Sequence, residues 1–89
     1  MCRSIRTLFN FEPPATDDEL RAASLQFVRK LSGFNAPSKA NQAVYDRAVA
    51  EVFQAARRLV DSLETATPAR DRAVEAAKAK ARVTRRLAP

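Results

Sequence analysis

The sequence predicts an all-α protein, a small three-helix domain preceded by an N-terminal arm. The chain has 89 residues, and glycine occurs once, at Gly33. A protein rich in β-hairpins needs more turn residues than this. Alanine, arginine, lysine and glutamate are abundant and favour helix. We therefore expect a single domain over 1–89, built from an antiparallel helical hairpin and a basic C-terminal helix.

Residues 1–15 form the predicted arm, whose large apolar side chains are Ile5, Leu8, Phe9 and Phe11. Three of them, Ile5, Leu8 and Phe9, fit the i, i+3, i+4 spacing of a helical turn. Ile5, Phe9 and Phe11 also fit the alternation of an extended segment, so both conformations stay open. In either conformation, we expect these side chains to pack onto the core.

The first long helix is expected at 16–32, within a hairpin core that spans 16–67. Thr16 is the predicted N-cap, and Glu19 three residues later completes a capping box. The two aspartates between them fill the first turn, where the helix dipole favours negative charge. Gly33 supplies the left-handed residue that ends the helix. The three consecutive acids are therefore interpreted as the start of a helix rather than as a carboxylate site.

The second helix is expected at about 39–64, and its apolar residues cover a face wider than a single partner helix requires. These residues are Val44, Tyr45, Ala48, Val49, Val52, Phe53, Ala56, Leu59, Val60 and Leu63. We expect the first helix, the arm and a second subunit to share this face. Tyr45 is placed in the core with its hydroxyl at the rim. Arg57 and Arg58 are placed in solvent, with Arg57–Asp61 as a surface ion pair.

The third helix is expected at 68–86, with Thr67 as its N-cap and Pro68 in the first helical position. Its apolar side consists mainly of alanine, so packing contributes less there than in the other helices. Residues 1–67 hold nine basic and eight acidic side chains, whereas residues 68–89 hold seven basic and two acidic ones. Nearly all of the chain's net charge of +6 therefore belongs to its last quarter.

The basic residues of this last quarter are candidate nucleic-acid contacts, because cations neutralise phosphates. They are Arg70, Arg72, Lys78, Lys80, Arg82, Arg85 and Arg86. No aromatic residue stands among them to stack on bases. A solvated helix explains the same distribution of charge, so both interpretations stay open.

Histidine is absent and the chain has one cysteine, Cys2. This composition excludes an internal disulfide, the usual His/Cys metal sites, and Ser-His or Cys-His nucleophile pairs. We expect no catalytic, cofactor-binding or metal-binding residue. Cys2 is a candidate reactive thiol, because Arg3 and Arg6 lie nearby and cations favour the thiolate. The chain has no apolar run long enough to span a membrane and no signal-peptide core, so we expect a cytoplasmic protein.

Three stretches are recognisable together: MCRSIRTLFNFEPPATDDELRAASLQFVRKLSG, PSKAN, and RRLVDSLET…PARDRAVEAAKAKAR. They resemble a small bacterial family known as domain of unknown function 2277. The resemblance implies a bacterial protein that usually makes up the whole chain, and it implies no activity, cofactor or site residue. We therefore expect a non-enzymatic binding protein, with another protein or its own copy as partner. The alternatives are nucleic-acid binding through the tail and a thiol-dependent activity at Cys2.

Overall fold

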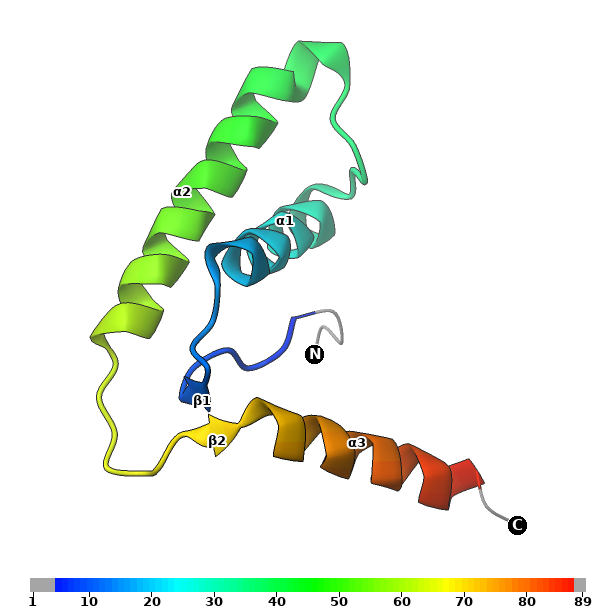
Figure 1. Ribbon diagram of the computed structural model, residues 1–89. Coiled ribbons are helices and arrows are strands. Elements are labelled where there is room, and N and C mark those ends of the chain that lie inside the picture. Colours follow the sequence, from blue (N-terminus) through cyan, green and yellow to red (C-terminus); the bar gives the residue numbers. More distant parts are fainter. Residues whose placement is uncertain (1–4, 88–89) are drawn as a thin grey trace.

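The computed structural model describes residues 5–87 and contains three helices joined by a small clasp of two short strands (Figure 1). The elements in order are β1 (Phe11–Glu12), α1 (Asp17–Ser32), the 3₁₀ helix η1 (Lys39–Asn41), α2 (Gln42–Ser62), β2 (Arg70–Asp71) and α3 (Arg72–Leu87). β1 and β2 pair in parallel, with Phe11 opposite Arg70 and Glu12 opposite Asp71. The predicted all-α, three-helix fold is confirmed.

Helix α1 begins and ends as the sequence predicts. The Thr16 hydroxyl accepts a hydrogen bond from the Glu19 N–H at 3.2 Å, and the Thr16 N–H donates to Glu19 Oε1 at 3.0 Å. Gly33 adopts φ 76° and donates its N–H to the Arg29 carbonyl at 2.9 Å. Capping box and left-handed stop therefore satisfy backbone groups that a helix leaves open at its two ends.

The core of the hairpin is small and lies between α1 and α2. Within the described part of the chain, the buried apolar residues are Ala15, Leu20, Val28 and Tyr45. Buried Ser24 donates its hydroxyl to the Leu20 carbonyl at 2.7 Å, so it leaves no polar group unpaired. Tyr45 is in the core as predicted, and its hydroxyl donates to the Phe34 carbonyl in the connecting loop at 3.0 Å.

Arg57 is not a solvent-facing residue, so its predicted placement was wrong. Its ion pair with Asp61 is confirmed, with Nη2–Oδ1 at 2.6 Å, but its side chain is only 26% exposed. Nη1 also donates to the Asp17 carboxylate at 3.2 Å and to the Ala15 carbonyl at 3.3 Å. Hydrogen bonds to Asp61, and then to Asp17, raise the pKa of Arg57. Arg57 thus ties α2 to the start of α1, whereas Arg58 is exposed as predicted.

Helix α3 begins at Arg72, not at the predicted Pro68. The Asp71 carboxylate, rather than Thr67, provides the capping contact by accepting from the Val74 N–H at 3.0 Å. The chain before the helix is held in another conformation by the arm, and this is why the local signal at Thr67–Pro68 does not start a helix.

Asn10 is the arm residue that holds this stretch. Its side-chain amide donates to the carbonyls of Thr67 and Pro68 at 3.2 and 3.3 Å, and its carbonyl accepts from the Arg70 N–H at 2.9 Å. Asn10 has φ 66°, a conformation that asparagine tolerates better than most residues. In the described part of the arm the helical turn does not form: residues 5–8 have no regular secondary structure, residues 9–10 form a bend, and Phe11–Glu12 is a strand. The large apolar side chains of the arm are half-buried.

The molecule is open rather than compact. Its radius of gyration is 16.2 Å, whereas a compact domain of this length has about 12 Å. α3 extends away from the α1–α2 hairpin and meets the rest of the chain mainly at the β1–β2 clasp (Figure 1). None of the helices described combines the length and apolar character that a membrane crossing requires.

Candidate functional site

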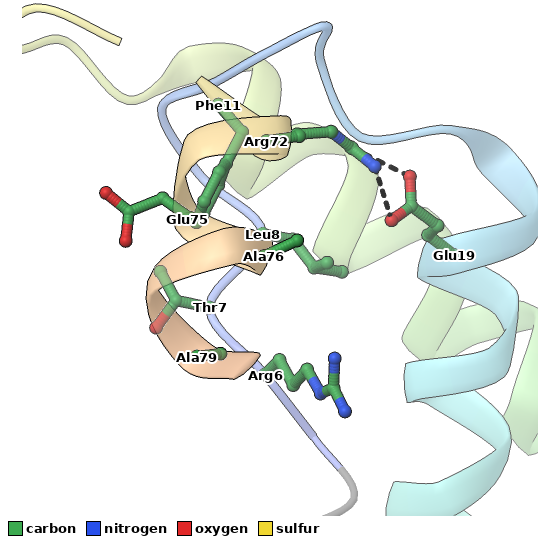
Figure 2. A pocket seen from close by; sticks show the side chains of 9 residues that line it. All are labelled: Arg6, Thr7, Leu8, Phe11, Glu19, Arg72, Glu75, Ala76 and Ala79. Carbon is green, nitrogen blue, oxygen red and sulfur yellow. Dashed lines mark hydrogen bonds and ion pairs between the residues drawn. The ribbon is translucent and has the colours of Figure 1, made fainter. Parts of the chain in front are cut away.

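The arm, α1 and α3 meet at one ion pair, between Glu19 and Arg72, which are 53 positions apart (Figure 2). Arg72 donates from Nη1 to Glu19 Oε2 at 2.9 Å and from Nη2 to Oε1 at 2.8 Å. Its Nε donates to the Pro13 carbonyl at 2.6 Å. This bidentate ion pair holds the first turn of α3 against the first turn of α1.

Glu19 therefore has two structural roles. It completes the capping box, which the sequence predicts, and it binds Arg72, which the sequence does not predict. The hydrogen bonds from Arg72, followed by the bond from the Thr16 N–H, lower the pKa of Glu19 from its usual 4.5 to about 2. The same contact raises the pKa of Arg72. Glu19 is ionised at neutral pH and both its oxygens already accept hydrogen bonds. It is thus a structural carboxylate and a poor general base.

A cleft of about 310 Å³ opens beside this ion pair, between the arm, α1 and α3. Its lining combines apolar and polar side chains, which Figure 2 shows: Arg6, Thr7, Leu8, Phe11, Glu19, Arg72, Glu75, Ala76 and Ala79. A second hollow of about 270 Å³ on the α1 side shares Arg6, Leu8 and Glu19 with the first. Leu8 and Arg6 therefore lie where the two hollows adjoin.

The charges of the cleft are mostly neutralised from within the chain. Glu19 is held by Arg72, and Glu75 lies 3.6 Å from the Lys78 ammonium. Arg6 is the lining charge that forms no ion pair with any residue the structure describes. The described residues also hold no group of three His, Cys, Asp or Glu side chains placed to bind a metal.

The structure divides the seven candidate nucleic-acid contacts. Arg72 is engaged by Glu19, Lys78 by Glu75, and Arg70 lies over the Phe11 ring at 5.6 Å from its centroid. Three of the remaining cations, Lys80, Arg82 and Arg85, are exposed on α3. The side chain of Arg86 and the candidate thiol Cys2 lie outside what the structure describes. Nucleic-acid binding stays a prediction that concerns the outer half of α3.

A surface on α2 is the other candidate site. Val44 and Leu59 are 73% and 59% exposed, although both are apolar and lie within a well-formed helix. Ala48 and Ala55 lie between them at helical spacing, half-buried and exposed respectively. We call these four residues the outer seam. Three of the four, Val44, Ala48 and Leu59, belong to the predicted wide apolar face of the second helix, and Ala55 was not part of that prediction. Because Val44 and Leu59 are exposed, α1 covers only part of the predicted face.

Sequence reasoning identified the basic residues of α3 but not the cleft. The seven cations look alike in the sequence, and nothing local distinguishes Arg72 from Lys80. In the sequence, Arg6 is one of two arginines close to Cys2, and nothing marks it as part of a cleft. Because the cleft is made by three segments that meet through the clasp, no single stretch carries a signal for it.

Comparisons with known proteins give one match. Neither the curated proteins nor the solved structures contain a significant match to the chain. The model of a family described as "Uncharacterized conserved protein (DUF2277)" matches residues 1–78. This match covers the arm, the hairpin and the first half of α3, and it confirms the resemblance seen in the sequence. The chain therefore belongs to the DUF2277 family.

Proposed function

We propose that the protein is a non-enzymatic binding protein whose working form contains a second protein chain, and that this chain is another copy of itself. One observation carries the proposal. The chain exposes 7309 Å², whereas a folded monomer of 9.8 kDa exposes about 5,200 Å². This surplus of about 2,000 Å² per chain exceeds the roughly 800 Å² per partner that a standard stable protein interface removes from solvent.

The nature of the exposed side chains supports the same conclusion. Within the described part of the chain, the exposed large apolar residues are Phe27, Leu31, Phe34, Val44, Leu59, Leu63, Val74 and Val83. Six of these eight lie on the hairpin and its loop. The four buried apolar residues that the structure describes make a small core for a domain of this length, and burial against a partner adds apolar contacts to it.

Charge favours association through the hairpin. Residues 1–67 carry a net charge of only +1, so two hairpins approach each other with little repulsion. The net +5 of residues 68–89 belongs to the tail, and α3 extends away from the hairpin. The most apolar and least charged part of the molecule is therefore the part available for a second copy.

Sedimentation equilibrium of the full chain, from about 1 to 100 µM, tests this proposal because self-association depends on concentration. We expect a mass of twice the 9.8 kDa of one chain at the upper concentrations. The dimer should persist in high salt, since apolar burial is not screened. A mass of one chain over the whole range would overturn the proposal.

The cleft supports a second candidate function, the binding of a small anion with a short apolar body. One turn of helix with its side chains fills about 400 Å³, more than the 310 Å³ of the cleft, so a small molecule fits better than a helix. Arg6 supplies the charge, while Leu8, Ala76 and Ala79 supply apolar walls. A ligand that fits both features carries a carboxylate or a phosphate group beside a few carbon atoms.

Isothermal titration with octanoate, octyl phosphate and octanol tests the cleft. We expect the two anions to bind and the alcohol to bind at least about tenfold more weakly. Arg6→Gln should weaken anion binding by a similar factor, while Arg58→Gln, at an exposed arginine on α2, should leave it unchanged. Equal binding of alcohol and anion, or no effect of Arg6→Gln, would refute this second candidate.

A further inference from the structure

We infer that two copies pair through the outer seam of α2, antiparallel and in a single register, with Val44 opposite Leu59 of the second copy and Ala48 opposite Ala55. The inference rests on the proposed self-association and specifies its geometry. It concerns one face of one helix. A dimer that forms through another face would therefore contradict the inference and leave the proposed self-association intact.

The outer seam has the form of a helix-packing stripe. Its residues follow one another at intervals of four, seven and four positions. At 100° per residue, all four lie within about 60° of arc on α2. This is the narrow apolar stripe by which two helices pack, in contrast to the broad face of a helix buried in a core. α1 packs on the neighbouring side of α2, where Tyr45 is buried, and leaves Val44 and Leu59 exposed.

The seam is also symmetric about its own midpoint. Val44 and Leu59 are equally far from the point between residues 51 and 52, and Ala48 and Ala55 are likewise equally far from it. A two-fold axis through this point places a large residue against a large residue at each end. At the centre it places alanine against alanine, which lets the two backbones approach closely. Such a self-complementary patch is what a two-fold interface requires.

A parallel pair would also match equal residues, but charge opposes it. The basic tail follows the C-terminal end of α2 (Figure 1). Parallel pairing would bring the two tails, each with a net charge of +5, to the same end of the dimer. Antiparallel pairing separates these tails by the length of α2, about 30 Å, well beyond the screening length of about 10 Å. The dipoles of the two helices also oppose each other in the antiparallel pair.

Cysteine cross-linking tests the register in a Cys2→Ser background. Val44→Cys and Leu59→Cys together should give a covalent dimer on mild oxidation, because facing Cα atoms of packed helices lie within disulfide reach. Either substitution alone should give none, since identical residues would lie about 22 Å apart. A cross-link from Val44→Cys alone indicates parallel pairing and overturns the inference. So does failure of the double variant, if the chain still sediments as a dimer.

A charge pair provides a second, independent readout. Ala48→Glu should weaken the dimer at least about tenfold, because it buries a carboxylate against Ala55 of the second copy. Adding Ala55→Lys should restore it, since each glutamate then faces a lysine across the interface. Ala50→Glu is the matched control on the opposite side of α2 and should change nothing. If the double substitution weakens the dimer further, the register is wrong. If the unaltered chain is a monomer, the proposed function itself has failed.

Discussion

Replacing Glu19 with glutamine should separate its two structural tasks. The glutamine side-chain carbonyl still accepts from the Thr16 N–H, because the capping box accommodates glutamine as well as glutamate. The substitution removes the negative charge that faces Arg72 in the bidentate ion pair, where the N–O distances are 2.8 and 2.9 Å. We therefore expect the loss of stability to report the attachment of α3 to α1 rather than the start of α1.

The magnitude follows from the pKa of Glu19, which the fold lowers from 4.5 to about 2. Each tenfold change in acidity corresponds to about 1.4 kcal/mol, so the ceiling is about 3 kcal/mol. The glutamate side chain is 35% exposed, and solvent screening reduces this figure to about 1–2 kcal/mol. Because the folded state lowers this pKa, the stabilisation is complete only above about pH 5, where the unfolded carboxyl is also mostly ionised. It declines as the pH falls from about 5 towards 2.

Urea unfolding followed by far-ultraviolet circular dichroism measures this effect at fixed protein concentration, at intervals between pH 2 and 7. The difference in unfolding free energy between the unaltered chain and Glu19→Gln should be constant above about pH 5 and vanish near pH 2. Asp18→Asn is the matched control, since it also removes a first-turn acid and costs only about 0.3–1 kcal/mol. A difference that does not change with pH, or one no larger than the control's, would refute this reasoning.

Three further substitutions test single contacts. Arg57→Ala should lower the urea midpoint more than Arg58→Ala, because only Arg57 bridges the two hairpin helices; equal midpoints would contradict this. Gly33→Ala should cost about 1 kcal/mol in thermal unfolding, purely from its φ of 76°, since the added methyl meets no atom within 4 Å; a stabilised variant would contradict it. Tyr45→Phe should cost about 0.5–1.5 kcal/mol, because the Phe34 carbonyl loses its donor; an unchanged unfolding free energy would show that water replaces the hydroxyl.

The basic tail shows which contacts a local sequence pattern does not predict. All seven tail cations looked equivalent as nucleic-acid contacts, yet Arg72 and Arg70 are engaged with the first helix and the arm. The prediction for the tail is therefore best tested on the outer residues, by replacing Lys80, Arg82 and Arg85 with glutamine and measuring retention on heparin against salt. Deleting the whole tail would also remove the clasp, and its result would not report binding alone.

The sequence by itself determined the three helices, the start and end of α1, the wide apolar face of α2 and the basic character of the tail. These features depend on residues within one or two turns of each other, such as Thr16 with Glu19, so the local order of residues is sufficient to predict them. Only the tertiary structure decided that α3 begins at Arg72, that Arg57 ties α2 to the start of α1, and that a cleft opens beside Glu19. Each of these depends on residues 40 or more positions apart, and which distant partners meet follows from packing and chain geometry, which no local pattern records.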